Sequence, residues 1–211
     1  MGAVIKIVGT GPGDPRHITP AALEAIQAAQ VVVGGRRLLD SFARPEQERC
    51  IIDKDLPAVV EFIQKQPQGK KVAVLVSGDP GFFSMAQYLK KRLQGLQLEF
   101  IPGISSVQYM FARLQLPWQQ VPFYSLHGRS MDKLPQWVKT APAVALLTGG
   151  EWSVQAIAAY LLNQQVKARV SIGINLSYPH EQVVHTTLEV LAEDGADYSN
   201  SVMVIFNENA F

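Results

Sequence analysis

Three short glycine-rich stretches contain the residues of this chain best suited to hold a small molecule. They are GTGPGDP at residues 9–15, SGDPG at residues 77–81 and PGISS at residues 102–106. Each follows an apolar, β-branched segment, so each is expected to form the turn after a buried strand. In an open α/β sheet, ligands bind beyond the carboxyl ends of the strands. Peptide N–H and C=O groups that glycine leaves uncovered could contact a polar small molecule there.

The first stretch does not fit either common phosphate-binding loop. A dinucleotide fingerprint needs a third glycine where this chain has Asp14, and it must open a helix directly. Here Thr19 and Pro20 predict that the helix begins several residues later. A P-loop would need a Lys-Ser or Lys-Thr pair, and an anionic Asp14 would repel a phosphate. Taken alone, GTGPGDP is equally well explained as a Gly/Pro turn between a strand and a helix.

The composition excludes several classes of protein. Of 211 residues, 47% are apolar and 18% are charged, which predicts a packed globular fold. The formal net charge of +1 gives no global basic field, so we expect no nucleic-acid partner. The apolar runs are too short to span a membrane, and the single cysteine, Cys50, fits a reducing compartment. We therefore expect a soluble, cytoplasmic protein without membrane contact.

The order of the expected elements gives an α/β fold in two halves. Up to about residue 114, apolar strands alternate with helices, which is typical of a mostly parallel sheet with helices on both faces. The stretch LQLPWQQVP, with two prolines, predicts a linker, so we expect domains at residues 1–114 and 115–211. The second half has five strand candidates and one clear helix, residues 153–163. Alternating polarity at residues 181–187 and near the C-terminus indicates antiparallel pairing, hence a mixed sheet.

The combination of motifs is more specific than any one of them. In this order, GTGPGDPRHIT, VLVSGDPGFFS and FIPGISSVQ resemble the tetrapyrrole (corrin and porphyrin) methylases, and the resemblance covers nearly the whole chain. It implies two α/β domains with a ligand cleft between them and S-adenosylmethionine as methyl donor. Within the family, VVVGGRRLL, LHGR and GINLSYPHE are most similar to the members that methylate carbon 5 of cobalt-precorrin-7 or precorrin-7 in cobalamin biosynthesis.

The resemblance also implies which residues bind S-adenosylmethionine. They are Pro12, Ser77, Gly78, Asp79, Phe82, Ser105 and Ser106, with Thr148, Gly173 and Asn175 toward the adenine end. A carboxylate such as Asp79 suits a ligand that carries a sulfonium and an ammonium group. Each motif also has a plainer explanation, since Asp79 could cap a local turn and Ser105 could cap the following helix.

For the substrate, the resemblance places GTGPGDP on the floor of a trough. The implied substrate-binding residues are Gly11, Gly13, Asp14, His127 and Arg129. Arginine can grip the carboxylates of a precorrin bidentately, and Arg16, Arg36, Arg37, Arg113 and Lys133 could join, although the sequence does not place them. Asp14 could instead accept a hydrogen bond in an Asx turn. The histidines do not have metal-ligand spacing, so we expect no metal.

The implied chemistry needs little from the protein beyond alignment. The sulfonium already activates the methyl group, and precorrin bridge carbons are enamine-like and electron-rich. Positioning of this kind can supply roughly 7–11 kcal/mol of the barrier. A base could complete the proton balance, and the candidates are Asp14, Tyr124, His127 and Glu181.

Other functions stay open at this level. The chain could methylate another precorrin position or a different large substrate such as a diphthine precursor, or it could be a non-catalytic module that binds S-adenosylmethionine. A dinucleotide-dependent oxidoreductase is disfavoured by the loop chemistry. The resemblance implies a homodimer and a separate carbon-15 methylase/decarboxylase as a partner.

Overall fold

The computed structural model describes residues 4–126, 130–148 and 152–207 of the chain. These residues form two compact units, Met1–Ser105 and Ser106–Phe211, each with its own sheet and core. In the described part of the chain, no helix is both long and apolar enough to cross a membrane.

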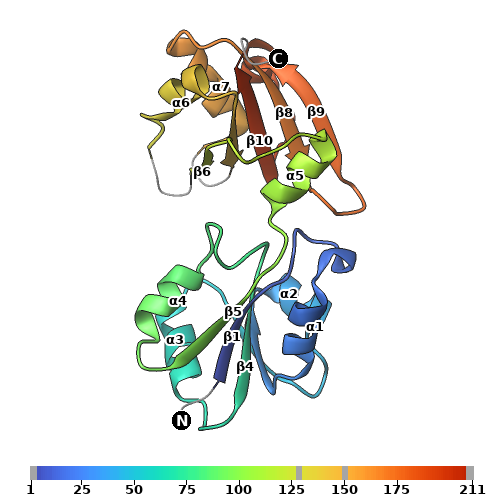
Figure 1. Cartoon of the computed structure of the whole chain (residues 1–211), viewed down its shortest axis with the longest axis vertical. Helices are drawn as coiled ribbons and strands as arrows, with labels where there is room; N and C mark the ends of the chain where they lie inside the picture. Colours follow the sequence, from blue (N-terminus) through green and yellow to red (C-terminus); the bar gives the residue numbers. More distant parts are fainter. Residues whose placement is uncertain (1–3, 127–129, 149–151, 208–211) are drawn as a thin grey trace. The chain divides into compact units, whose positions relative to one another are not determined.

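The first unit is built on a five-stranded parallel sheet in the order β3-β2-β4-β1-β5 (Figure 1). Its strands are β1 (Val4–Gly9), β2 (Val31–Gly34), β3 (Glu48–Ile51), β4 (Lys71–Val76) and β5 (Gln97–Ile101). The connecting helices are η1 (Pro15–His17), α1 (Pro20–Gln27), α2 (Arg36–Phe42), α3 (Leu56–Gln64) and α4 (Ala86–Arg92). The predicted alternation of strands and helices in a parallel sheet is confirmed.

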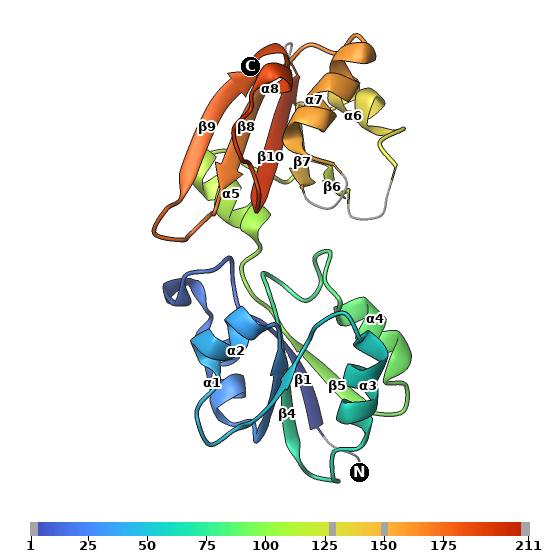
Figure 2. The same cartoon turned by 180° about the vertical axis from the view of Figure 1, so that it is seen from behind.

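Helices cover both faces of this sheet, as Figures 1 and 2 show from opposite sides. Helices α1 and α2 pack on one face, where Val8, Val32 and Leu75 point. Helices α3 and α4 pack on the other face, against Ile7, Val33 and Val74 among others. Neighbouring residues of one strand thus enter opposite cores, which explains why the strands are apolar throughout.

The start of α1 follows the predicted capping chemistry. The Thr19 hydroxyl accepts a hydrogen bond from the Ala22 backbone N–H at 3.2 Å, and Pro20 occupies the first helical position. The segment from Gly9 to Thr19, which contains only the short 3-10 helix η1, therefore separates β1 from α1, so α1 does not begin directly behind the glycines.

The second unit has a five-stranded mixed sheet in the order β6-β7-β10-β8-β9. Its strands are β6 (Phe123–Ser125), β7 (Ala143–Leu147), β8 (Ala168–Ile174), β9 (Gln182–Thr187) and β10 (Ser201–Asn207). Only β6 and β7 are parallel, and the other three pairings are antiparallel. The expectation of five strands in a mixed sheet is confirmed.

Helices α6 (Leu134–Thr140), α7 (Val154–Asn163) and α8 (Leu188–Glu193) share one core with this sheet. Of these three helices, only α7 was predicted from the sequence. Helix α5 (Ser106–Leu114) covers the opposite face, as Figure 2 makes visible.

The position of α5 differs from the domain boundary expected after residue 114. The division of the chain falls at Ser105–Ser106, so α5 counts with the second unit. The reason is packing: the Phe111 ring meets Phe123 edge-to-face at 6.4 Å between centroids, and Met110 lies against Gly173 of β8. The apolar face of α5 is therefore packed against the second sheet.

Candidate functional site

The three glycine-rich loops of the first unit meet at one edge of its sheet. Strand β1 lies between β4 and β5, and all three are parallel, so the loops that follow them leave at the same edge. Two backbone hydrogen bonds join the first two loops: the Gly11 N–H donates to the Gly78 carbonyl at 3.2 Å, and the Gly78 N–H donates to the Gly11 carbonyl at 2.8 Å. The loops are thus held together by their main chains.

Gly9, Gly78 and Gly103 form the centre of this arrangement, which we call the glycine junction. A Cβ atom on Gly9 would lie 2.6 Å from the Gly78 carbonyl oxygen and 2.8 Å from the Gly103 nitrogen. A Cβ on Gly103 would collide with the same Gly78 oxygen and with the Gly9 carbonyl. Gly78 itself has a φ of +67°, a conformation that glycine adopts at little cost. Close backbone contacts thus favour glycine at positions 9 and 103, and the positive φ favours it at position 78.

The Asp79 carboxylate ties the second loop to the third. Its Oδ1 accepts a hydrogen bond from the Gly81 N–H at 2.7 Å, which is the local turn that the sequence allowed. Its Oδ2 accepts a second bond from the Gly103 N–H at 3.1 Å, and Gly103 follows a different strand. Asp79 therefore fixes the shape of the junction and places a negative charge beside it.

The other predicted cofactor residues of the first unit surround the junction in different ways. The Ser105 Cα lies 3.4 Å from the position of a Cβ on Gly78, and Ser105 is only 5% exposed. The exposed Ser77 hydroxyl accepts a hydrogen bond from Arg37 at 3.1 Å. The Phe82 ring meets the neighbouring Phe83 ring edge-to-face at 4.8 Å. Pro12 is half-buried in the loop after β1.

In the second unit, three of the predicted cofactor residues share one edge of the sheet. Thr148 follows β7, Gly173 lies in β8 and Asn175 follows β8. Between these strands runs β10, and the residues at its start hold the two polar side chains. The Thr148 hydroxyl donates to the carbonyl of Ser201, the first residue of β10, at 2.7 Å, and the amide of Asn200, directly before β10, donates to Asn175 Oδ1 at 3.1 Å. The sequence analysis missed Asn200 and Ser201. The signal that could have pointed to them is their position, since both are polar and stand directly before the apolar run of β10.

Gly173 and Ser106 are connected to this edge through α5. Ser106 is the first residue of α5, and the Met110 sulfur of that helix would lie 2.6 Å from a Cβ placed on Gly173. Glycine at position 173 thus lets α5 approach the sheet closely.

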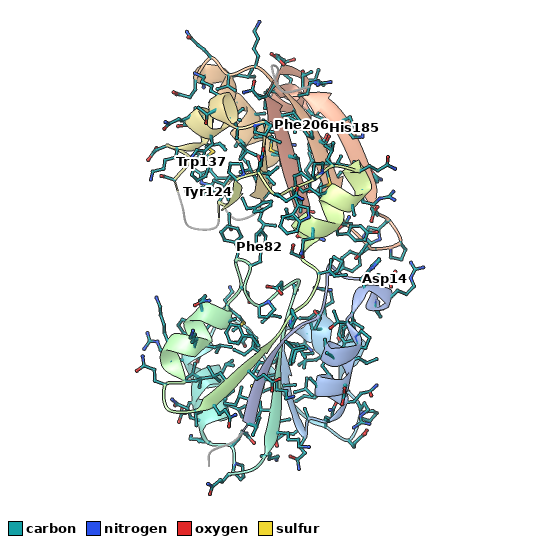
Figure 3. All side chains as sticks on the ribbon, in the orientation of Figure 1. Asp14, Phe82, Tyr124, Trp137, His185 and Phe206 are labelled. Carbon is teal, nitrogen blue, oxygen red and sulfur yellow. The ribbon has the colours of Figure 1, made fainter. Side chains whose placement is uncertain are left out.

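Asp14, which Figure 3 labels on the loop after β1, forms the Asx turn that the sequence left open. Its Oδ1 accepts from the Arg16 backbone N–H at 2.8 Å, and its Oδ2 accepts from the Arg16 guanidinium at 2.7 and 2.9 Å. The guanidinium and the backbone amide of Arg16 lower the pKa of this carboxyl from 3.8 to about 2. Such a carboxylate is a poor proton acceptor near neutral pH. The predicted substrate residues Gly11 and Gly13 lie in the same loop, where Gly11 is buried.

The described proton-acceptor candidates of the second unit are also engaged by neighbours. The Tyr124 hydroxyl donates to the Ser130 carbonyl at 3.0 Å, and its ring packs against Trp137, as Figure 3 shows. Glu181 accepts from the Arg113 guanidinium at 2.7 Å and from the Ser177 backbone N–H at 2.6 Å. The remaining predictions, His127 and Arg129, lie outside the described residues. Among the described residues, no group of His, Cys, Asp and Glu side chains is arranged to hold a metal ion.

Comparison with known proteins identifies the class. The family profile of the tetrapyrrole (corrin/porphyrin) methylases matches residues 4–192, so the chain belongs to this family. The cobalt-precorrin-7 C(5)-methyltransferase of Salmonella typhimurium is 32% identical over 208 residues, which cover 97% of this chain and 100% of that protein.

Two solved structures share the fold. The precorrin-6Y methylase (cbiE) of Archaeoglobus fulgidus has a TM-score of 0.78 and 21% identity, over 99% of this chain and 100% of that chain. The uroporphyrin-III C-methyl transferase of Thermus thermophilus, complexed with S-adenyl homocysteine, has a TM-score of 0.76 and 24% identity, over 96% of this chain and 91% of that chain. The predicted fold class is thereby confirmed.

The glycine junction leads to a first prediction. Gly9→Ala should destabilise the protein by about 1–3 kcal/mol or more, because its methyl group has to displace backbone atoms of two neighbouring loops. Gly195→Ala is the control, since Gly195 is exposed outside any helix or strand, a Cβ there meets nothing within 4 Å, and its φ is not in the left-handed region. Thermal unfolding of the two variants measures the difference. Equal melting temperatures for both would contradict the account of the junction.

The second prediction concerns Asp79. Asp79→Asn leaves one oxygen to serve two N–H donors, so the Gly81 or the Gly103 amide loses its partner, at a cost of about 1–3 kcal/mol. Asp53→Asn is the matched control, because Asp53 accepts only a local bond from the Asp55 N–H that asparagine can also accept. Denaturant unfolding should show a lower midpoint for Asp79→Asn alone. An unchanged midpoint would mean that the cross-loop bond contributes nothing.

The third prediction is a titration of Asp14. Because the folded-state pKa lies below the ordinary value, the stabilisation is present above pH 3.8 and is lost as the pH falls from 3.8 to about 2. Carboxyl-carbon NMR should give a pKa of about 2 for Asp14 in the native protein. Arg16→Gln should raise it toward 3.8, whereas Arg49→Gln, whose guanidinium bonds the Ala43 carbonyl, should leave it unchanged. A normal pKa in the native protein would refute the Asp14–Arg16 turn.

Proposed function

We propose that this chain is an S-adenosylmethionine-dependent C-methyltransferase that acts on carbon 5 of cobalt-precorrin-7 or precorrin-7 in cobalamin biosynthesis. The observation that carries the proposal is the 32% identity, over 97% of the chain, to a protein named cobalt-precorrin-7 C(5)-methyltransferase. The geometry of the glycine junction supports it independently, through its fit to the methyl donor.

The junction suits the chemistry of S-adenosylmethionine. The amino-acid end of this molecule carries a carboxylate and an ammonium group, and its sulfur carries a positive charge. The Asp79 carboxylate, held by the Gly81 and Gly103 N–H groups, offers a negative charge beside the cationic groups. Because Gly9, Gly78 and Gly103 have no side chains, a ligand could approach the main chain closely. Ser77 and Phe82 would add a hydroxyl and an apolar ring.

The residues of the second unit complete this assignment as a proposal. Thr148 is held by Ser201, the first residue of β10, and Asn175 by Asn200 directly before it, while Gly173 lies at the same edge with α5 packed closely against it. We propose that these residues, with Ser106, contact the adenosine part through backbone hydrogen bonds and apolar packing.

The protein's contribution to the reaction would be alignment. Bound S-adenosylmethionine supplies a methyl group that its sulfonium already makes electrophilic. Asp14, Tyr124 and Glu181 are each engaged by a neighbouring group, so none of them is arranged as a strong base. Fixed loops that orient the donor and exclude water can account for roughly 7–11 kcal/mol of the barrier. His127 stays a candidate proton acceptor, and Arg129 a candidate substrate contact.

We also propose the setting in which this enzyme works. The free Cys50 and the absence of a membrane-spanning helix among the described residues are consistent with a cytoplasmic protein. We propose a homodimer that passes its product to a separate carbon-15 methylase/decarboxylase. Light scattering of the purified chain, which measures its molar mass in solution, tests whether it is a dimer.

The fourth prediction tests the activity directly. The purified protein, incubated with a defined cobalt-precorrin-7 or precorrin-7 and methyl-labelled S-adenosylmethionine, should add one labelled methyl group, which mass spectrometry detects. NMR of the product should locate the label at carbon 5. In calorimetry, S-adenosylmethionine and its demethylated product should bind, whereas NAD should not.

Each alternative has its own outcome in this experiment. A label on another ring carbon would replace the proposed position with another precorrin methylase activity. Donor binding without turnover on either substrate would indicate a non-catalytic binding module. Binding of NAD but not of the methyl donor would overturn the proposal altogether.

A further inference from the structure

A cavity of about 390 Å³ lies within the first unit, beside the carboxyl ends of β2 and β4. Its lining comes from the start of α2, from the residue after β3 and from the loop between β4 and α4. The described lining residues are Gly35, Arg36, Arg37, Leu38, Ile52, Leu75, Val76, Ser77, Phe83, Ser84 and Met85. Ser77 belongs both to this lining and to the loops of the glycine junction, so the cavity adjoins the proposed donor site.

The polar part of this lining is suited to an anion. Arg36 and Arg37 are both exposed, and Ser77 and Ser84 add hydroxyl groups. None of the described lining residues is acidic. The Arg37 guanidinium donates a hydrogen bond to the Ser77 hydroxyl at 3.1 Å, which fixes where that side chain lies. A guanidinium held in this way can donate further N–H groups to a carboxylate in a bidentate arrangement.

The apolar part of the lining contains an unusual residue. Phe83 is 40% exposed, and its backbone has a φ of +46°, in the left-handed region that bulky residues rarely adopt. Residues held in such conformations cluster at ligand sites, because the surrounding structure has to maintain them. Together with Ile52 and Met85, Phe83 offers an apolar wall next to the two arginines.

We infer that this cavity binds a carboxylate-bearing side arm of the substrate macrocycle, with the carboxylate on Arg36 and Arg37 and the methylene groups on the wall around Phe83. The inference rests on the proposed function, since a precorrin carries several carboxylate arms. Other arginines considered from the sequence are less suitable. Arg16 and Arg113 each lie 2.7 Å from a carboxylate of the protein, Asp14 and Glu181 respectively.

The charge of the cavity favours the substrate over the methyl donor as the source of this carboxylate. The carboxylate of S-adenosylmethionine sits on the same carbon as an ammonium group, which two neighbouring guanidinium groups would repel. A propionate or acetate arm has no such cation. The amino-acid end of the donor is better served by the Asp79 carboxylate and by the glycine junction, where no side chain keeps a ligand from the main chain.

The fifth prediction compares Arg36→Gln and Arg37→Gln with Arg92→Gln. Loss of a charge-assisted bond to a carboxylate should raise KM for the precorrin roughly tenfold in each of the first two variants, with a much smaller change in kcat. In Arg36→Gln, the affinity for the demethylated donor, measured by calorimetry, should stay within about twofold of the native value, because Arg36 is not among the proposed donor contacts. Arg37→Gln also releases the Ser77 hydroxyl, so for that variant only KM for the precorrin and the porphyrin affinity are compared. Arg92→Gln removes the same charge from the same unit at a residue that does not line the cavity, since the Arg92 guanidinium lies over the Tyr88 ring at 5.5 Å. This variant should change neither KM for the precorrin nor the donor affinity.

A binding measurement separates this inference from the proposed activity. Uroporphyrin, a stable octacarboxylate macrocycle, should bind the native protein and Arg92→Gln with equal affinity. The shift of its absorption band on binding measures this affinity. Arg36→Gln and Arg37→Gln should bind it roughly tenfold more weakly, and raised salt should reduce the difference. A tetracationic porphyrin should not bind.

The outcomes are distinguishable. If the native protein methylates a precorrin and the two variants keep the native KM and porphyrin affinity, the cavity inference is overturned while the proposed function stands. If Arg36→Gln loses donor affinity alone, the carboxylate belongs to the donor, which also overturns it. If the native protein methylates neither precorrin, the proposed function fails, and porphyrin binding that Arg36→Gln and Arg37→Gln do not weaken overturns the carboxylate site as well.

Discussion

The close approach of three backbones at Gly9, Gly78 and Gly103 is the constraint on which the rest of the candidate site depends. Strand β1 lies between β4 and β5, so the loops after these strands have to pass one another within a few ångströms. A side chain at Gly9 or Gly103 would push the loops apart, and one at Gly78 would be strained by the positive φ. Because the contact is made by main chain, the surface at this edge consists of peptide groups. Asp79 then fixes the loops through two of those peptide groups and leaves its charge beside them.

Much of the fold could be predicted from the sequence, because the strands of the first unit are buried on both sides and read as continuous apolar runs. The start of α1 at Thr19 could also be predicted, because a capping threonine followed by proline is a signal between neighbouring residues. Strand β3 was missed because it lies at the sheet edge, where Glu48 and Arg49 are exposed and no apolar pattern forms. Helices α6 and α8 are short, and α5 was placed with the wrong neighbours, since an amphipathic helix does not reveal which sheet buries it.

The site was predictable to the extent that its contacts are local or follow from strand order. The convergence of the three loops follows from parallel strands, and the Asp14 turn is a contact between residues two positions apart. The Glu181–Arg113 ion pair and the Thr148–Ser201 hydrogen bond could not be predicted, because they depend on which helix covers the second sheet and on β10 lying beside β7. Such long-range contacts determine the partners of Glu181 and Thr148, and a sequence without its fold does not reveal them.

A backbone site and a side-chain site at one sheet edge can divide the task of recognition. Peptide groups of the glycine junction are the same whatever side chains surround them, so they can hold a common donor but discriminate little between large substrates. Discrimination requires groups that reward one ligand and penalise another, and charged side chains do this strongly. Arg36 and Arg37 follow β2, the next strand beyond β4, so they stand beside the loops of the glycine junction without being part of them. Substitution of Arg36 or Arg37 can change substrate affinity while the glycine junction keeps its shape. Because the two groups of residues are separate, an enzyme that works by positioning can hold one donor and still select among macrocycles.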